Sequence, residues 1–370
     1  MHVKSILLKN FRNIASQEIE PNKRINVYSG DNAQGKTNFL EALYYVNKGR
    51  SFRTSRDKNL IKWNEKYAYI AAELSTRGKN FLVEIGISSD GGKLFKINNK
   101  KCSYSQMFSL SGTVLFTPED LFLVKGAPQQ RRAFLDNEIG PSFKEYVYYL
   151  RQYKYTLEQR NNLIRNIARN RKDLSTIDVW DEQLAGYGSK LIRHRLFILK
   201  ELSNEVNLIH VKLSGGERIA INYLSSFNLT EKLKEEIIKK DFLSALQKKR
   251  EEELFRQQTL IGPHRDDLKF VVNGMDARDF ASQGQQRTIV LTLKLSLIKV
   301  MSKWHGDFPV LLLDDVLFEL DGKRRKFLLR ELEKDIQVFL TTNNTECFSA
   351  INRENIQYYV VDSGIIKERG

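Results

Sequence analysis

The stretch GDNAQGKT, residues 30–37, matches the complete G-x-x-x-x-G-K-[ST] pattern of a phosphate-binding P-loop. A strand-like run from Arg24 to Ser29 precedes it, and the helix-like run NFLEALYYV follows it. This strand–loop–helix order is the context in which the pattern cradles nucleotide phosphates. The stretch therefore predicts an α/β nucleotide-binding fold. Its candidate binding residues are Gly30, Asp31, Asn32, Ala33, Gln34, Gly35, Lys36 and Thr37.

Four positions of this loop have separate predicted roles. Gly30 and Gly35 let the backbone turn so that its N–H groups face the phosphates at a helix N-terminus. Lys36 is expected to bind the β- and γ-phosphate oxygens, and Thr37 to coordinate Mg²⁺. No Asn-Lys-x-Asp guanine motif occurs, because the similar stretch TTNNTE lacks the lysine. ATP and Mg²⁺ are therefore the expected cofactors.

A second signal is VLLLDDV, residues 310–316, which predicts a buried parallel strand ending in two carboxylates. We expect Asp314 to hold the hydration shell of Mg²⁺. Asp315 is expected to orient or deprotonate the attacking water. The pair is a weak signal alone and a strong one together with the P-loop. Lys36, Asp315 and the serine of a signature loop form the predicted catalytic set.

The P-loop and the aspartate strand lie near opposite ends of the chain. Architectures with this split place a signature loop at the start of the helix that leads into the aspartate strand. Upstream of Asp314, the stretch SQGQQRTIVLTLKLSLIKVM begins with a Ser-x-Gly-Gln loop, and apolar residues then recur at helical spacing. The predicted signature residues are Ser282, Gln283, Gly284 and Gln285.

A competing stretch, LSGGE at residues 213–217, matches the usual signature letters more closely. The chain that follows it, RIAINYLSSF, alternates apolar and polar residues and therefore predicts a strand. A signature loop must begin a helix, so that free N–H groups point at a phosphate. We interpret LSGGE as an exposed hairpin turn in which Gly215 and Gly216 supply positive φ angles.

Secondary-structure patterns divide the chain into three parts. The first third predicts strands at residues 3–9, 24–29, 67–75, 81–88 and 94–98. Long helices are expected over residues 128–207 and 229–258, and strands return at 259–261, 268–272 and 309–313. The predicted domains are an ATPase part at 1–125, a mainly helical lobe at 126–257 and a second ATPase part at 258–370.

Composition narrows the possible partners and compartments. The chain has 370 residues, 41% of them apolar, and a formal charge of +15, which favours a polyanion such as nucleic acid. A soluble basic protein without such a partner is the alternative. Only two cysteines occur, and the sequence shows no secretory leader and no apolar run of membrane-spanning length. We therefore expect a cytoplasmic protein that does not contact the membrane.

Several ordered motifs resemble the RecF family, a branch of the ABC-type ATPases related to Rad50 and SMC heads. These motifs are NFRN (10–13), SFRT (51–54), FTPEDL (116–121), RRAFLD (131–136), GPHRDD (262–267), SQGQQR (282–287) and LLLDDVLFELD (311–321). The resemblance runs over nearly the whole chain. Each flanking motif is weak alone, and their order makes them specific.

The resemblance implies an α/β ABC-ATPase head built from both ends of the chain, with a helical lobe and no long coiled coil. It implies a homodimer that forms on ATP, with slow, DNA-stimulated hydrolysis. The expected partners are duplex and gapped DNA, with a preference for single-strand/duplex junctions. RecR and RecO are further expected partners in loading RecA at gaps.

The resemblance also carries roles onto particular residues. Asp314 and Asp315 match the Walker B pair, the signature loop acts on the partner chain's nucleotide, and residues 319–321 resemble a D-loop. Arg12 and Asn13 resemble a segment close to the nucleotide. Two departures stand out: Asp315 replaces the usual catalytic glutamate, and no histidine follows the strand at 336–340, which leaves Thr342 or Asn343 as the γ-phosphate switch.

Candidate DNA contacts lie in the helical lobe. A helical wheel gathers five basic residues on one flank of LRQYKYTLEQRNNLIRNIARNRK: Arg151, Lys154, Arg165, Arg169 and Lys172. An ordinary solvated helix face is the alternative. A second basic group, with the same alternative, is Arg50, Arg53, Arg56 and Lys58. His264 is either a DNA or nucleotide contact or a structural histidine.

Two other functions stay open from the sequence. The chain could be the ATPase subunit of a membrane transporter, although the helical insertion and the basic charge argue against this. It could also be a scaffold that binds ATP without hydrolysing it. Whether DNA or phospholipid stimulates hydrolysis distinguishes a DNA-binding ATPase from a transporter subunit. Single-turnover phosphate release distinguishes a hydrolysing protein from a scaffold.

Overall fold

The computed structural model describes the chain except for residues 104–111, 171–175, 231–233, 333–335, 344–354 and 370. The chain divides into two compact units. Unit 1 comprises Met1–Asp120 and Leu293–Gly370, and unit 2 comprises Leu121–Thr292. Each unit is described by itself below.

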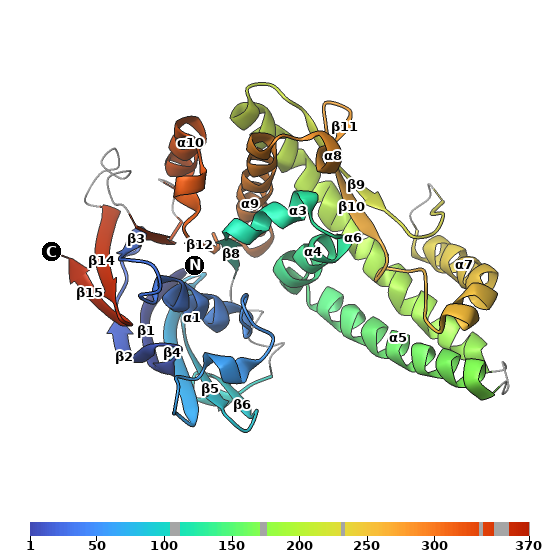
Figure 1. The fold of residues 1–370 in the computed structure, drawn as a ribbon, viewed down its shortest axis with the longest axis horizontal. Coiled ribbons are helices and arrows are strands. Elements are labelled where there is room, and N and C mark those ends of the chain that lie inside the picture. Colours follow the sequence, from blue (N-terminus) through green and yellow to red (C-terminus); the bar gives the residue numbers. More distant parts are fainter. Residues whose placement is uncertain (104–111, 171–175, 231–233, 333–335, 344–354, 370) are drawn as a thin grey trace. The chain divides into compact units, whose positions relative to one another are not determined.

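One sheet of unit 1 is built from both ends of the chain. Its strand order is β15 (Ile365–Arg369), β14 (Ile356–Asp362), β3 (Ile25–Ser29), β13 (Val338–Thr342), β12 (Val310–Leu313) and β8 (Thr113–Phe116). All neighbours pair in parallel except β14 and β15. Figure 1 shows the red C-terminal strands beside blue β3. The P-loop and the aspartate strand thereby reach the same sheet.

The second sheet of unit 1 is antiparallel. Its order is β2 (Ile14–Ile19), β1 (His2–Phe11), β4 (Tyr67–Thr76), β5 (Lys79–Ser88), β6 (Lys93–Ile97) and β7 (Lys100–Lys101). Helix α1 (Lys36–Lys48) contributes most of its residues to one core with both sheets. Phe39 of α1 and Tyr28 of β3 pack at a centroid distance of 4.6 Å, and Tyr28 stacks on Tyr359 of β14 at 4.7 Å. Because both sheets contact α1, the helix is buried around most of its circumference, and its buried residues include the polar Lys36, Glu41, Asn47 and Lys48.

The strands predicted at residues 3–9, 24–29, 67–75, 81–88, 94–98, 268–272 and 309–313 are present, with each boundary within two residues of the prediction. The prediction of a strand at residues 259–261 is wrong. The backbone N–H of Thr259 donates to the Asn161 side chain, and its carbonyl accepts from Arg265. Side-chain partners thus take the hydrogen bonds that a neighbouring strand would provide. Strands β2, β8, β14 and β15 are not predicted from the sequence because they are short or only partly alternating, and neither are the two-residue strands β7 and β11.

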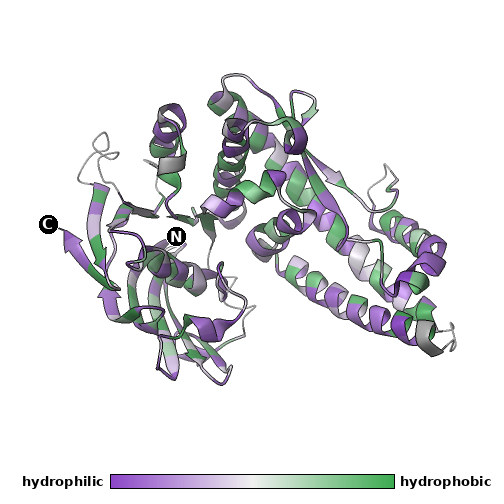
Figure 2. Ribbon diagram, in the orientation of Figure 1, coloured by the Kyte–Doolittle hydropathy of each residue, from purple (hydrophilic) through white to green (hydrophobic). Residues whose placement is uncertain are grey.

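Unit 2 is mainly helical. Helix α5 (Lys144–Asn170) packs against α6 (Ile177–Ser214), and α7 (Glu235–Arg256) packs against both. Residues of α5 are largely hydrophilic in Figure 2, with hydrophobic residues spaced along the helix. The helices predicted from the periodicity are therefore confirmed. The region predicted to hold long helices, residues 128–207, begins with three shorter elements: α4 (Pro128–Ala133), the π-helical η3 (Phe134–Ile139) and η4 (Gly140–Ser142).

Buried charges connect the helices of unit 2. Arg160 of α5 is fully buried and donates to Asp181 of α6 at 2.6 Å and to Glu253 of α7 at 2.7 Å. Arg195 of α6, also buried, donates to Asp136 at 2.8 Å and to the Pro263 carbonyl at 2.7 Å. Since each guanidinium is paired, these charges specify how the helices meet without leaving an uncompensated ion in the interior.

A three-stranded antiparallel sheet completes unit 2, in the order β11 (Met275–Asp276), β10 (Asp267–Val272) and β9 (Ile219–Leu224). Its pairing joins residues that the sequence analysis divided between the helical lobe and the second ATPase part. The compact units therefore change at residue 292, within α9 (Gln283–His305), and not at 257. The other described helical elements of the two units are short: η1 (Asp57–Leu60), η2 (Pro118–Leu121), α3 (Phe122–Lys125), α8 (Ala277–Phe280), η6 (Val316–Glu319) and α10 (Gly322–Leu332).

Candidate nucleotide site

The P-loop runs from the end of β3 to the start of α1, as the sequence predicts. Two of its glycines are required by close approaches. A Cβ on Gly30 would lie 2.3 Å from the Val361 carbonyl oxygen of β14. A Cβ on Gly35, where φ is +115°, would lie 2.8 Å from the Asn13 side chain. No side chain caps the N-terminus of α1, so the N–H groups of its first turn suit an anion.

Lys36 is buried, and its ammonium group is held by neighbouring acceptors. Its Nζ donates to the carbonyls of Gly30 at 2.7 Å and Asp31 at 3.0 Å, and also to Asn343 Oδ1. Asn343 follows β13 and donates to Asn32 Oδ1 at 2.9 Å. Of the two residues considered for the γ-phosphate switch, Asn343 accepts a hydrogen bond from the P-loop lysine, and Thr342 is buried within β13.

The carboxylate of Asp314 meets the P-loop although the two are far apart in the sequence. Thr37 Oγ1 donates to Asp314 Oδ1 at 2.9 Å, and Thr341 Oγ1 donates to the same oxygen at 2.8 Å. Burial raises the pKa of Asp314, while these two hydrogen bonds and the nearby charge of Arg53 lower it. A hard cation would favour the ionised carboxylate, so the Thr37–Asp314 pair suits Mg²⁺.

Asp315 lies at the N-terminus of η6 with a φ of +51°. Its backbone N–H donates to Thr341 Oγ1 at 2.9 Å. Its Oδ1 is buried and has no hydrogen-bond partner among the described residues. An orphaned carboxylate oxygen is costly in an interior unless a ligand or water completes it. Asp315 therefore fits a site that a nucleotide and its attacking water would fill.

The segment containing Arg12 and Asn13 contacts the P-loop side of α1. Asn13 Nδ2 donates to the Gln34 carbonyl at 3.0 Å. Arg12 makes a bidentate pair with Glu41 of α1, with both distances 2.8 Å. Glu41 is fully buried, and the sequence analysis did not single it out because it stands in an apolar helix run without a motif. Arg12 thus contacts α1, while Asn13 supports the loop directly.

Arg53, from one of the two basic groups of the sequence analysis, lies beside the P-loop. Its Nη1 donates to Asn38 Oδ1 at 2.8 Å and lies 3.5 Å from Glu41 Oε2. Residues 50–55 with Asp57 and Lys93 line an open hollow of about 430 Å³. The positive charge of Arg53 favours ionised Asp314. Basic composition identified this residue, but only the fold brings it to the aspartate.

In unit 2, the predicted signature loop begins helix α9. The N–H of Ser282 donates to Gln285 Oε1 at 2.9 Å, and the N–H of Gln285 donates to Ser282 Oγ at 3.2 Å. This reciprocal pattern is a capping box. Ser282 and Gln283 are exposed, whereas Gln285 and Gly284 are partly buried. The helix N-terminus predicted for this loop is therefore confirmed, and its exposed residues face solvent.

The hairpin turn predicted at residues 213–217 is wrong in its detail. Ser214 is the last residue of the long helix α6, and Gly215, with φ of +83°, ends it. The Gly216 N–H donates to the Val211 carbonyl at 2.9 Å, which closes the helix C-terminus. The strand β9 follows, as predicted. A helix C-terminus presents carbonyl groups and partial negative charge, so this stretch does not suit a phosphate.

The predicted DNA stripe lies on α5. Arg151, Lys154 and Arg165 are exposed, and Arg165 donates to Asn162 Oδ1 at 2.5 Å. Arg169 falls in the last turn of α5, where side chains lie outside the described part, and Lys172 is outside the described residues. Leu157 is partly buried and Ile164 is buried, so the apolar flank packs inward as expected. Exposure alone fits either a DNA contact or a solvated face.

His264 is held inside unit 2 by two neighbours. Its Nε2 lies 3.2 Å from the Thr259 carbonyl, which can only accept, so Nε2 carries the proton. Its Nδ1, 2.6 Å from Tyr153 Oη, then accepts from the tyrosine. Burial lowers the pKa of His264 to about 4. Both ring nitrogens are satisfied, which favours the structural interpretation of this histidine.

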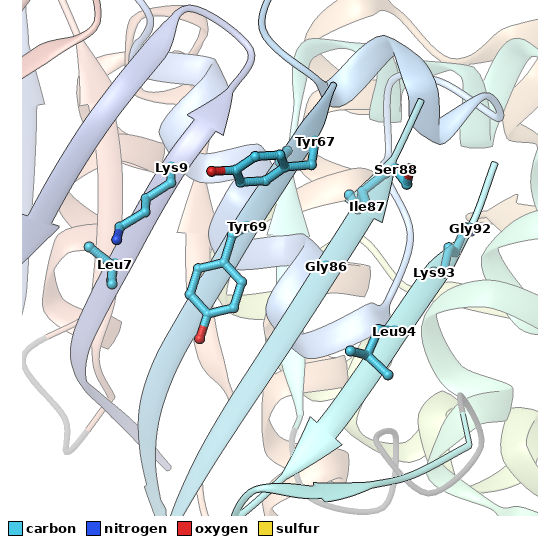
Figure 3. Close-up of a pocket in the computed structure, with 11 residues that line it drawn as sticks. Leu7, Lys9, Tyr67, Tyr69, Gly86, Ile87, Ser88, Gly92, Lys93 and Leu94 are labelled. Carbon is cyan, nitrogen blue, oxygen red and sulfur yellow. The ribbon is translucent and has the colours of Figure 1, made fainter. Parts of the chain in front are cut away.

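A second hollow, of about 710 Å³, lies on the outer face of the antiparallel sheet of unit 1. Figure 3 shows Tyr67 and Tyr69 of β4 beside Lys9 of β1, with Leu94 of β6 across Gly86. Its lining includes none of the predicted nucleotide residues. Among the described residues, no group of three or more His, Cys, Asp and Glu side chains is arranged to hold a metal ion. No helix in the described part of the chain is long and apolar enough to cross a membrane.

Comparison with known proteins agrees with this geometry. Residues 2–367 match the family model of the RecF/RecN/SMC N-terminal domain. The chain is 45% identical over 342 residues to the DNA replication and repair protein RecF of Pelotomaculum thermopropionicum, covering 92% of this chain and 93% of that one. The protein of the same description from Clostridium acetobutylicum is 40% identical over 370 residues, covering both chains fully. The chain belongs to the RecF family.

Solved structures support the same assignment. A structure described as the recombination mediator protein RecF with ATP in the RecFOR pathway superposes on this chain with a TM-score of 0.93 at 36% identity. It covers 100% of this chain and 98% of the RecF chain. An Smc head domain from Pyrococcus furiosus has a TM-score of 0.55 at 18% identity, which supports the fold alone. The predicted ABC-ATPase head of the RecF type, without a long coiled coil, is confirmed.

Proposed function

We propose that this chain is an ATP-switched DNA clamp of recombinational gap repair: ATP joins two copies, and the dimer binds duplex or junction DNA. The observation that carries this proposal is the Thr37–Asp314 contact of 2.9 Å. It joins a phosphate-binding loop to an acidic strand end, which is the pairing that a nucleotide-hydrolysing site needs. The RecF relatives support the repair role, and their names do not describe a transporter.

Four residues of unit 1 would perform the chemistry. Lys36 exchanges its contact with Asn343 for the β- and γ-phosphate oxygens. Thr37 and Asp314 hold Mg²⁺, which neutralises phosphate charge when it is bound. Asp315 uses its orphaned Oδ1 to orient the attacking water or accept its proton. The shorter aspartate in place of glutamate supports weak turnover.

The signature loop completes the site of a second copy. Ser282 is exposed at the N-terminus of a 23-residue helix, so its hydroxyl and the following N–H groups can meet a γ-phosphate. Each ATP would then contact the P-loop of one chain and Ser282 to Gln285 of the other. Two identical sites related by two-fold symmetry follow from such an exchange.

The proposal extends to DNA binding and to partner proteins. The formal charge of +15 supports binding to the phosphate backbone of double-stranded or gapped DNA. Arg151, Lys154, Arg165, Arg169 and Lys172 remain the candidate contacts. RecR and RecO are the proposed partners for loading RecA, on the strength of the family and of the RecFOR pathway named for its solved members. We expect the protein to act in the cytoplasm, with ATP and Mg²⁺ as its cofactors.

The test is light scattering of the protein with ATP and Mg²⁺, with and without gapped duplex DNA. We expect ATP to double the mass of wild-type protein and Ser282→Arg to stay monomeric while still binding ATP. The bulky cation would displace donors meant for the opposite phosphate and obstruct the approach of the second chain. A Ser282→Arg protein that dimerises normally would contradict the exchange of loops.

Mixing two variants tests whether each site is composite. Lys36→Ala keeps a signature loop but loses its P-loop lysine, and Ser282→Arg has the opposite defect. A mixture can restore one complete site per dimer at most, because each site needs one loop from each chain. Hydrolysis by the mixture above the sum of the separate variants is the expected result. Full wild-type activity, or none, would count against composite sites.

A further inference from the structure

The loop that follows α6 lies against the signature loop within unit 2. Glu217, which ends the LSGGE stretch, accepts a hydrogen bond from Gln285 Nε2 at 2.7 Å. The same Gln285 side chain accepts the Ser282 N–H through its Oε1. Both ends of one amide are therefore fixed, one by the helix N-terminus and the other by Glu217.

Glu217 is itself held in place by its own stretch of chain. Its N–H donates to Ser214 Oγ at 2.9 Å, and Ser214 Oγ donates to the His210 carbonyl at 2.7 Å. The second carboxylate oxygen of Glu217 lies 3.7 Å from His210 Nε2. The side chain of Glu217 is 27% exposed, so the carboxylate sits at the edge of the interior. The conformation that ends α6 thus aims this carboxylate at Gln285.

A second contact connects the same two elements farther along α9. His210 is fully buried, and its Nδ1 lies 3.2 Å from Thr292 Oγ1. Burial lowers the pKa of His210 and outweighs the opposing effect of the Glu217 charge, which favours the neutral imidazole. The α6 C-terminus therefore meets α9 at its first turn through Gln285 and at its third turn through Thr292. Two contacts along one helix fix its orientation better than one.

From this arrangement we infer that Glu217 is a positioning residue for the signature loop, holding Gln285 and thereby the Ser282 N-terminus in the conformation that receives a phosphate from a second copy of this chain. The inference rests on the proposed exchange of loops and adds to it the support that one loop requires. Ser282 and Gln283 are exposed, and the capping box that orders Ser282 uses the same Gln285 side chain that Glu217 holds. The negative charge of Glu217 also stabilises the positive end of α9.

Two substitutions separate the hydrogen bond from the charge. Glu217→Ala removes the acceptor for Gln285, and Glu217→Gln keeps an oxygen acceptor of the same shape without the charge. In light scattering with ATP and Mg²⁺ at varied protein concentration, we expect Glu217→Ala to raise the half-dimerisation concentration about tenfold and Glu217→Gln to raise it less than about threefold. Binding of a fluorescent ATP analogue to the monomer is expected to be unchanged in both, because the P-loop is untouched.

A matched control and a milder variant keep the test decisive. Glu236→Ala makes the same charge change at an exposed position of α7 and is expected to dimerise as wild type does. If Glu217→Ala does not fold, Ser214→Ala removes the acceptor of the Glu217 N–H and is expected to raise the half-dimerisation concentration about twofold to threefold. Thermal unfolding of each variant identifies a loss of fold.

The outcomes distinguish this inference from the proposed function. Dimerisation of Glu217→Ala at the wild-type concentration would overturn the positioning role, and so would equal losses in Glu217→Ala and Glu217→Gln. A lowered unfolding temperature with unchanged dimerisation would make Glu217 a purely structural residue and would also overturn it. If Ser282→Arg dimerises normally as well, the exchange of loops itself fails.

Discussion

The two units use charged side chains in opposite ways. In unit 2, Arg160 and Arg195 are buried with every strong partner supplied by the chain. In unit 1, Asp315 keeps a buried carboxylate oxygen with no partner among the described residues, and Lys36 is held by carbonyls and an amide, not by a carboxylate. A complete network stabilises a fold, while an incomplete one is ready for a ligand. Substitutions in the buried arginine network of unit 2 should therefore alter stability, and substitutions at the P-loop should alter ATP chemistry.

The largest expected effect is on the stability of unit 2. Arg160→Ala leaves two carboxylates buried beside each other, Asp181 at 2% exposure and Glu253 at 1%. We expect a loss of about 3 to 5 kcal/mol in the free energy of unfolding, measured by urea denaturation. Arg193→Ala, which breaks an exposed ion pair on α6, is the control and should cost less than about 1 kcal/mol. Similar losses in the two variants would contradict the contrast between the units.

Lys36→Ala should weaken ATP binding and leave the stability of the fold nearly unchanged. Phosphate charge loses its compensating ammonium, and we expect ATP affinity to fall by about 2 to 4 kcal/mol with no ATP-induced dimer. The unfolding midpoint without nucleotide should stay close to that of wild type. Titration with a fluorescent ATP analogue measures the first quantity and thermal unfolding the second. Normal affinity in this variant would exclude the P-loop assignment.

Asp315→Asn should separate ATP binding from hydrolysis. Asparagine keeps the size of the side chain but cannot accept a proton as a carboxylate does. We expect hydrolysis to fall on the order of 10²-fold, with ATP binding retained and a longer-lived dimer. Single-turnover phosphate release with Mg²⁺ measures the change, and it also tests the scaffold alternative, in which even wild type releases no phosphate. Unchanged turnover in the variant would place the base elsewhere.

His264 should make unit 2 sensitive to acid. Its pKa of about 4 in the folded chain lies below the usual 6.5, so between these values the unfolded chain binds a proton that the folded chain does not. The free energy of unfolding should therefore fall by about 2 to 3 kcal/mol as the pH decreases from 6.5 to 4. His264→Gln, which does not titrate, should flatten this dependence in urea denaturation. An equal slope in both proteins would assign the acid sensitivity to other groups.

The smallest expected effect concerns exposed charges on α5. DNA affinity should fall with salt at a log–log slope of about −0.9 for each phosphate contacted. Replacing Arg151 and Arg165 by glutamate should make that slope shallower by about two such contacts, whereas Lys240→Glu on α7 should not change it. Fluorescence anisotropy with a gapped duplex measures the slope. An unchanged slope in the α5 variant would favour the solvated-face interpretation.

The nucleotide loop and the type of element that follows each of the two signature-like stretches can be predicted from the sequence. Each depends on local patterns: a motif between a strand and a helix, an apolar run before two aspartates, and the type of element that follows a Ser-Gly stretch. Sequence order alone also indicates that one head is built from both ends of the chain. The local sequence is informative here because a phosphate site needs particular residues at fixed spacing.

Other features were decided only by the tertiary structure. Contacts with residues that are distant in the sequence or on another element determine the positions of Glu41, Arg53 and Glu217. Such contacts produce no periodic pattern in the sequence. The LSGGE stretch shows the limit best: its letters and the strand after it indicate a turn, but not that the turn ends the long helix α6 and supports α9. A side chain's role is fixed by the neighbours that folding brings to it, and those neighbours are absent from its own stretch of sequence.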